Sequence, residues 1–171
     1  TVDPMGAKTV IAYDPAARVV SVTDARQVAT TYKYDGFGQL WQQVSRDSGT
    51  TTFAYTTQGL RSSMTRNDGS SLAYEYDTLG RLVSAGTEIA SRNYTWDSCS
   101  GGKGRLCAHE VVSSGVVNNS GTRVYDAFGA LTSKRDNVFG ASDLTSIPRD
   151  GEGRATGITY PSGTKLRYTF T

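Results

Sequence analysis

The sequence predicts an all-β fold of tandem antiparallel β-hairpins that pair edge to edge in an open strip. Three observations predict it. An aromatic residue followed by Asp recurs at a fixed spacing, a Gly follows at a fixed offset, and apolar and polar residues alternate with period 2 between turns. Helices have no support, because Gly or a turn cluster interrupts the chain about every ten residues.

Composition narrows the function classes. The chain has 171 residues and a formal net charge of +2, and it contains no Lys/Arg cluster of the kind that nucleic-acid-binding proteins carry. The apolar runs are far shorter than the about 20 residues of a membrane-spanning helix. One histidine, His109, and two cysteines give little basis for a His-based or metal-based active site. We therefore expect no enzymatic activity, no cofactor, no nucleic-acid partner and no membrane span.

The repeat has the form Tyr-Asp-x-x-Gly-x-Leu. Its tyrosines at 13, 34, 55 and 76 follow one another at intervals of 21 residues, and the period loosens afterwards. Trp replaces Tyr at 96, where four inserted residues delay the Gly and Leu, and Arg149 replaces Tyr before Asp150. The predicted motif residues are Tyr13, Asp14, Tyr34, Asp35, Gly38, Leu40, Tyr55, Gly59, Tyr76, Asp77, Gly80, Leu82, Trp96, Asp97, Gly104, Leu106, Tyr125, Asp126, Gly129, Leu131, Asp150 and Gly153.

Each unit is predicted to contain a strand, an Asp-x-x-Gly turn, a second strand and a polar turn. Residues 71–76 alternate apolar and polar side chains, as in a strand with one covered face. In the motif, Asp accepts a hydrogen bond from the N–H two residues on, and Gly adopts the left-handed conformation that closes the turn. Residues 67–70, Asn-Asp-Gly-Ser, supply a turn of the second kind.

A single hairpin is marginally stable, so neighbouring units must pair. The Tyr of each motif is then expected to stack on the Tyr of the next, with cross-strand contacts of about 0.2–1 kcal/mol each. The open edges of such a strip also predict self-association, because unpaired strand edges attract other chains.

Residues 34–40 (YDGFGQL) and 76–82 (YDTLGRL) resemble the YD repeat of the Rhs family, which includes bacterial Rhs polymorphic toxins, the C component of Tc toxin complexes and animal teneurins. The resemblance extends over residues 9–171, and residues 1–8 are interpreted as an expression leader or linker. It implies a curved YD-repeat strip, a piece of a longer array that forms a hollow shell around a C-terminal toxin. The implied partners are the rest of the shell and its toxin, in a secreted or cell-surface bacterial protein.

Cys99 and Cys107 flank the inserted loop, where they either face each other across the base of a turn or remain unpaired thiols. A disulfide closing so short a loop contributes about 2.5 kcal/mol in the chain-entropy model, and it fits an oxidising compartment. A zinc site needs about four ligands. These two cysteines and His109 are too few, so no metal site is predicted.

Two further patterns could suggest phosphate binding or nucleophilic catalysis. The glycines of residues 101–104 lack the spacing of a phosphate-binding loop and are interpreted as a lengthened turn. His109 has no nucleophile-elbow pattern around it and is interpreted as a strand residue. Two functions remain open: a structural segment of a shell, and a surface module that binds carbohydrate or a protein partner through its tyrosine-rich face.

Overall fold

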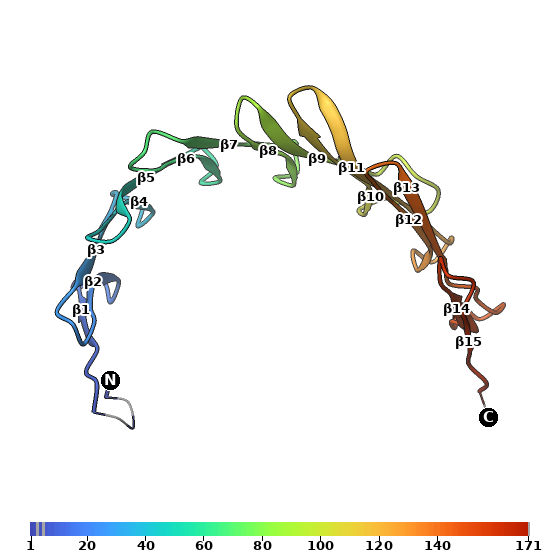
Figure 1. Ribbon diagram of the computed structural model, residues 1–171, viewed down its shortest axis with the longest axis horizontal. Helices are drawn as coiled ribbons and strands as arrows, with labels where there is room; N and C mark the ends of the chain where they lie inside the picture. The colour runs from blue at the N-terminus through green and yellow to red at the C-terminus, as the bar shows by residue number, and fades with distance from the viewer. Residues whose placement is uncertain (3, 5, 171) are drawn as a thin grey trace. The chain divides into compact units, whose positions relative to one another are not determined.

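The computed structural model describes residues 1–2, 4 and 6–170 and is all-β (Figure 1). Fifteen antiparallel strands form one open sheet, in which the order of the strands follows the order of the chain. The predicted class, tandem antiparallel hairpins in an open sheet, is confirmed. None of the described residues forms a helix long and apolar enough to cross a membrane. Asp3 and Met5 of the predicted leader, and Thr171, lie outside the described residues.

The chain divides into two compact units, residues 1–74 and 75–171, and the boundary falls within the seventh strand. The strands of the first unit are β1 (Val10–Tyr13), β2 (Val19–Thr23), β3 (Ala29–Tyr34), β4 (Leu40–Ser45), β5 (Gly49–Tyr55), β6 (Arg61–Thr65) and the larger part of β7 (Ser71–Tyr76). The complete strands of the second unit are β8 (Leu82–Gly86), β9 (Ala90–Trp96), β10 (Leu106–Ser113), β11 (Val116–Tyr125), β12 (Leu131–Val138), β13 (Ala141–Ser146), β14 (Gly157–Thr159) and β15 (Lys165–Arg167).

A register shift marks the end of the strand that leads into a motif turn. Tyr34 pairs with Leu40 across the turn, and the register shifts between Lys33 and Tyr34. Equivalent shifts occur between Ala54 and Tyr55 and between residues 124 and 125. A β-bulge of this kind accommodates one extra residue and increases the local twist. The motif aromatic therefore lies at a fixed position relative to its turn in each hairpin where the shift occurs.

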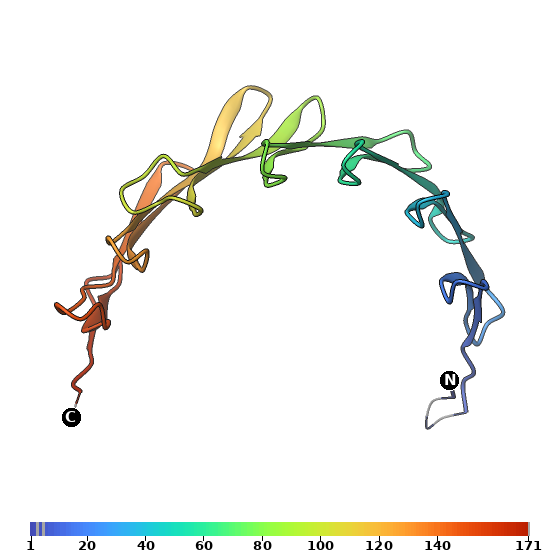
Figure 2. The same ribbon diagram turned by 180° about the vertical axis from the view of Figure 1, so that it is seen from behind.

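The sheet is a single layer in each unit (Figures 1 and 2). Strand β3 alternates exposed and half-buried residues, and its half-buried side includes Tyr32 and Tyr34. We call the side of each unit that carries the motif aromatics the motif face. Among the described side chains, Cys107 is the one buried hydrophobic residue, at 2% exposed. Main-chain pairing and side chains lying along the sheet must therefore stabilise these units in place of a packed core.

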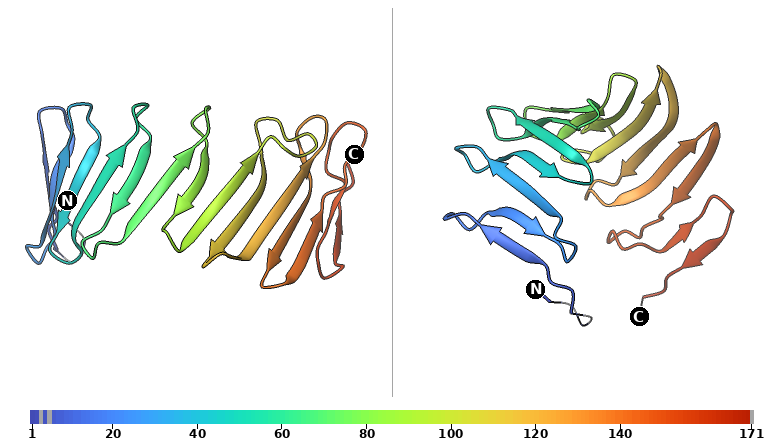
Figure 3. Two further views of the ribbon diagram at one scale, coloured as in Figure 1. Left: turned by 90° about the horizontal axis from the view of Figure 1, so that it is seen from above. Right: turned by 60° about the vertical axis from the view of Figure 1, so that its left-hand side comes forward.

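The turns lie along both margins of each unit (Figure 3). The motif turns connect odd-numbered strands to the next strand and share one margin, because a meander returns to the same side after every second strand. The other turns, including residues 66–70, lie at the opposite margin, and Gly69 there donates its N–H to Arg66 O at 3.0 Å. This topology places successive motif turns of one unit next to each other.

Candidate functional site

The Asp-x-x-Gly segment closes a tight turn, as residues 35–39 illustrate. Asp35 N–H donates to Gln39 O at 2.9 Å, and Gly38 N–H donates to Asp35 O at 3.1 Å. Asp35 Oδ1 accepts the N–H groups of Phe37 and Gln39, both at 2.9 Å. Gly38 has φ +80°, a conformation that glycine adopts without steric cost. The carboxylate and the glycine together fix the shape of this turn.

The same two main-chain bonds recur in the other short motif turns, which are residues 14–18, 56–60, 77–81, 126–130 and 150–154. Two of these turns depart from the consensus. Ala17 occupies the glycine position at φ +59°, and Thr56 takes the place of Asp, with its Oγ1 accepting the N–H of Leu60 at 3.2 Å. The fold of the turn thus tolerates either replacement when the rest of the motif remains.

The aromatic side chain of the motif reaches back to the preceding repeat. Tyr55 Oη donates to Leu40 O at 2.7 Å, and Leu40 is the residue that pairs with Tyr34, the aromatic of the preceding motif. The other bonds of this kind join Tyr34 to Val19 O (2.8 Å), Trp96 Nε1 to Leu82 O (2.9 Å) and Tyr125 to Leu106 O (2.8 Å). These four motif aromatics therefore each join two neighbouring repeats.

This arrangement differs from the expected column of rings stacked directly on one another. Tyr34 and Tyr55 lie on β3 and β5, with β4 between them. Two inter-strand spacings amount to about 9.6 Å, which is too far for direct ring contact. A guanidinium lies over the ring instead: Arg18 Cζ is 4.8 Å from the centroid of Tyr34. The equivalent pairs in the second unit are Arg81 over Trp96 (5.0 Å), Arg105 over Tyr125 (5.7 Å) and Arg154 over Phe170 (4.9 Å).

The arginine that follows the motif glycine position has two roles. Arg18 Nε donates to Asp14 Oδ2 of its own motif at 2.7 Å, while its guanidinium lies over Tyr34 of the next. Arg81 and Arg154 repeat the first contact with Asp77 and Asp150, at 2.7 and 2.8 Å. This arginine is not part of the motif predicted from the sequence. Its signal was present, because an arginine directly follows the glycine position in several motifs.

Arg149 replaces the motif Tyr and retains the bond to the preceding repeat. Its Nη2 donates to Leu131 O at 3.0 Å and its Nη1 donates to Gly153 O at 2.8 Å. Its Nε also lies 3.7 Å from Asp126 Oδ2. A long cationic side chain thus performs the positioning that a phenol hydroxyl performs elsewhere.

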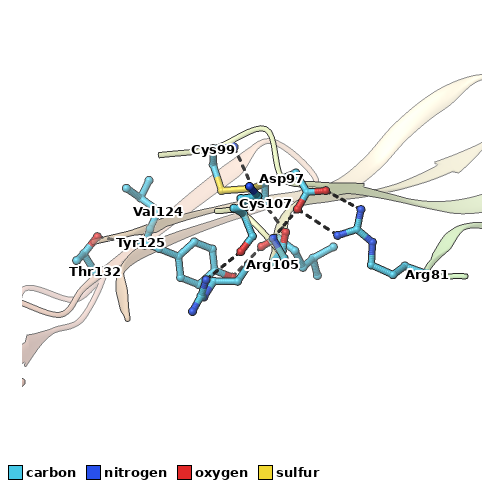
Figure 4. Close-up of a disulfide and its surroundings, with 11 residues drawn as sticks. Arg81, Asp97, Cys99, Arg105, Cys107, Val124, Tyr125 and Thr132 are labelled. Carbon is cyan, nitrogen blue, oxygen red and sulfur yellow. Dashed lines mark hydrogen bonds and ion pairs between the residues drawn. A yellow bond between two sulfur atoms is a disulfide. The ribbon is translucent and has the colours of Figure 1, made fainter. Parts of the chain in front are cut away.

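A disulfide joins Cys99, in the lengthened turn of residues 97–105, to Cys107 at the start of β10 (Figure 4). Cys99 N–H contacts Cys107 Sγ at 3.0 Å, and Gly102 packs so closely that a Cβ there would lie 2.4 Å from Cys99 Sγ. The loop also reaches the next motif, because Tyr125 N–H donates to Ser100 O at 3.2 Å. The inserted residues therefore add a covalent closure and a second contact between repeats.

Asp97 keeps the role of the motif aspartate within this longer turn. Its Oδ1 accepts Gly104 N–H at 2.6 Å, and its Oδ2 accepts Arg81 Nη2 at 2.6 Å (Figure 4). The hydrogen bonds from Arg81 and then from Gly104 hold the pKa of Asp97 below its usual value. The hydrogen bond from Arg81 joins the turn to the preceding motif, because Arg81 also contacts Asp77.

The residues weighed for chemistry lie in ordinary strand and turn positions. His109 is on β10, with Nε2 3.3 Å from Asn119 Oδ1 and Nδ1 3.2 Å from Arg123 Nη1. Gly101 and Gly104 have φ of +62° and +76° within the lengthened turn. Within the part of the chain that the structure describes, no group of three or more His, Cys, Asp or Glu residues is placed to hold a metal ion.

Residues 13–51 match the family model described as RHS Repeat. These residues therefore carry an RHS repeat, and the resemblance that the motifs predicted is confirmed. No curated protein matches the chain.

Solved structures of Tc toxin components share the fold. The chain is similar to one in the crystal structure of TcdB2-TccC3-Cdc42, with TM-score 0.70 and 16% identity over 95% of this chain and 9% of that one. For the crystal structure of TcdB2-TccC3 without its hypervariable C-terminal region, the TM-score is 0.68 and the identity 14%. That match covers 90% of this chain and 9% of the other. For the structure of the Photorhabdus luminescens Tc holotoxin pore, the TM-score is 0.54 and the identity 13%. That match covers 88% of this chain and 12% of the other. The chain thus spans about a tenth of each of those chains.

Proposed function

We propose that this chain is a structural segment of an RHS-type YD-repeat shell, which in its full-length parent encapsulates and delivers a C-terminal toxin. One observation carries the proposal: the motif side chains are engaged with neighbouring repeats or with their own turn. Tyr55 bonds Leu40 of the preceding repeat, and Arg18 joins its own Asp14 to the ring of Tyr34. Contacts of this kind hold successive repeats of an array together.

The motif carboxylates support a structural role over a catalytic one. Asp77 Oδ1 accepts the N–H groups of Leu79 and Arg81, and its Oδ2 accepts Arg81 Nε. A general base must have an oxygen available to a substrate proton. Because the same bonds recur in several repeats, we interpret these aspartates as turn-forming residues of a scaffold.

The partners and location follow from the same proposal. The partners are the remaining repeats of the shell and the enclosed toxin, and the parent is a secreted or cell-surface protein. Two findings support this: the RHS repeat at residues 13–51 and the disulfide between Cys99 and Cys107. Disulfides persist chiefly in oxidising compartments outside the cytosol.

Limited proteolysis of the full-length parent tests encapsulation. We expect the C-terminal segment to resist trypsin while the array is folded, and to become cleavable when Gly38→Val disrupts a motif turn. Gly36→Ala, two residues away in the same turn, is the matched control and should leave the segment protected. Equal cleavage of the C-terminal segment in the wild type and in Gly38→Val would count against encapsulation.

A binding module is the second candidate, and one observation favours it. Tyr32 and Tyr74 lie on the motif face of the first unit, half-buried, and no hydrogen bond of their hydroxyl groups is seen among the residues described there. Such rings present a flat surface and a free hydroxyl to a sugar. Saturable binding on a glycan array that Tyr74→Ala abolishes, with an unchanged circular dichroism spectrum, would support this function. Absence of binding by the wild type would exclude it for the glycans tested.

A further inference from the structure

A recess of about 320 Å³ lies on the motif face of the second unit, over β9, β10 and β11. Its polar lining includes Arg92, Tyr94, His109, Asn119 and Arg123. The strand register explains why these side chains converge. Tyr94 pairs with His109. Arg92 and Asn119 both pair with Val111, which lies on the same side of β10 as His109. Arg123 lies on the same side of β11 as Asn119.

The imidazole of His109 is held in one orientation at the floor of this recess. Arg123 can only donate, so His109 Nδ1 accepts from Arg123 Nη1 at 3.2 Å. The ring proton then lies on Nε2 and is donated to Asn119 Oδ1 at 3.3 Å. The ring lies over Gly121, where a Cβ would approach His109 Cε1 to 2.3 Å. Glycine at this position gives the ring its space.

The recess has an excess of positive charge. Within the described residues, neither Arg92 nor Arg123 forms an ion pair, whereas Arg81 and Arg154 each contact a carboxylate. Arg123 is half-buried, and it lies directly opposite another cation, Lys134, in the register of β11 and β12. Like charges directly opposite one another destabilise a sheet, and of these two cations Lys134 has a carboxylate partner while Arg123 has none among the described residues.

Glu110 also lines the recess and Asp136 lies near it, and both carboxylates have other partners. Asp136 Oδ2 lies 3.3 Å from Lys134 Nζ. Glu110 Oε1 accepts Asn93 Nδ2 at 2.9 Å. Neither carboxylate forms an ion pair with the guanidinium groups of Arg92 and Arg123. The positive charge of these two arginines therefore remains available to a ligand.

We propose that this recess binds a small oxyanion, a carboxylate or a phosphate group, between Arg92 and Arg123. A guanidinium presents several N–H donors in a planar fork that matches the oxygens of either group. Tyr94 supplies a hydroxyl from the neighbouring position on β9, and His109 fixes the direction of Arg123. The site borders a motif contact between repeats, because Leu106, which accepts the bond from Tyr125, also lines the recess. It adds a binding function to the proposed scaffold.

Nuclear magnetic resonance tests the site directly, because His109 is the only histidine of the chain and its ring signals are unambiguous. The full chain is titrated at constant pH with sodium phosphate and with sodium acetate, and sodium chloride at equal ionic strength serves as the reference. We expect saturable shifts of the His109 ring signals with at least one oxyanion and none with chloride. Tighter binding of phosphate assigns the site to phosphoryl groups, and tighter binding of acetate assigns it to carboxylates.

Variants separate specific binding from general screening of charge. Arg123→Gln and Arg92→Gln should each weaken binding at least tenfold. Arg92 is exposed, so its replacement should leave the fold intact even if Arg123→Gln does not fold. Arg135→Gln is the control. Arg135 lies on the face of the sheet opposite to the recess, where it contacts Ser142, so this variant should bind as the wild type does. An equal response to chloride, or unchanged binding by Arg92→Gln, would overturn the proposal.

Discussion

The guanidinium of Arg149 donates to the carbonyl oxygen of Leu131 at 3.0 Å. Tyr55 makes the equivalent bond to Leu40 with its hydroxyl at 2.7 Å. Two chemically different side chains thus satisfy the same acceptor at the same place in the repeat. The requirement at this position is a donor of sufficient reach, and an aromatic ring is one of two ways in which this chain meets it.

Replacement of Arg149 tests this equivalence. Arg149→Ala removes a charged donor from Leu131 O and should lower the free energy of unfolding by about 1.5–3 kcal/mol. Arg149→Tyr should recover most of that loss, because a hydroxyl at this position reaches the same acceptor. Urea unfolding followed by circular dichroism measures both. Equal stability of the Ala and Tyr variants would show that the bond to Leu131 contributes little.

The hydroxyl bonds between repeats are tested at Tyr55. Tyr55→Phe keeps the ring and leaves Leu40 O without this donor, so we expect a loss of about 1 kcal/mol in the free energy of unfolding. Tyr13 occupies the same motif position and is 58% exposed, and no hydrogen bond of its hydroxyl is seen among the residues described. Tyr13→Phe is therefore the matched control, with no expected change. Equal effects of the two changes on the urea midpoint would contradict the assignment.

A pair of glycines in one turn tests the backbone argument. Gly38 has φ +80°, so Gly38→Ala should cost about 1–2 kcal/mol of stability. Gly36 has no positive φ and nothing within 4 Å of an added Cβ. Gly36→Ala should be neutral, or stabilising by about 0.4–1 kcal/mol through the unfolded state. Thermal unfolding of the two variants measures the difference, which should vanish if the turn has another conformation.

The disulfide is tested by reduction. The Cys99–Cys107 link closes a loop with a sequence separation of 8, for which the chain-entropy model gives about 2.5 kcal/mol. Dithiothreitol should therefore lower the melting temperature of the wild type. The Cys99→Ala/Cys107→Ala double variant should melt near the reduced wild type and should not respond to dithiothreitol. A wild type unaffected by reduction, with loss of the bond verified by thiol labelling, would contradict this expectation.

Stability should decrease on acidification because of the motif carboxylates. Hydrogen bonds from Arg81 and Gly104 lower the pKa of Asp97 in the folded chain. A group whose folded pKa is depressed stabilises the fold above its unfolded pKa of about 3.9, and the stabilisation is lost as the pH falls through the folded value. We expect unfolding free energies to decline below about pH 4.

The variant Asp97→Asn isolates this contribution. It should be less stable than the wild type at pH 7 and should lose less stability on acidification, because one depressed carboxyl is missing. Glu88→Gln, at an exposed turn position, serves as the control and should follow the wild type. A parallel acid profile of Asp97→Asn and wild type would refute the role of Asp97.

The sequence was sufficient to predict the hairpins, because the chemistry of their turns is local. Asp35 and Gly38 act within a few residues of each other, and the alternation in β7 is visible in the sequence alone. The contacts between repeats were harder to predict. The acceptor of the Tyr55 hydroxyl lies 15 residues earlier in the chain, and the register of the strands brings the two together. The spacing of the motif also does not distinguish a ring stacked on another ring from a ring beneath an arginine.

The recess near His109 depends even more on register. Arg92, His109 and Arg123 are separated by more than a dozen residues along the chain, and they come together because β9, β10 and β11 are adjacent. The sequence presents each of them as an isolated charged or polar residue. Their convergence is a property of strand pairing.

The array has a direction, because the motif aromatics at 34, 55, 96 and 125 each donate to a carbonyl of the preceding repeat. Gene duplication or deletion of one entire repeat would preserve every donor and its acceptor. Loss of part of a repeat would leave a donor without its acceptor, or an acceptor without its donor. Lineages should therefore vary in copy number by whole repeats, with extra residues accommodated at the margins. The lengthened turn of residues 97–105, which a disulfide links to β10, is one such insertion.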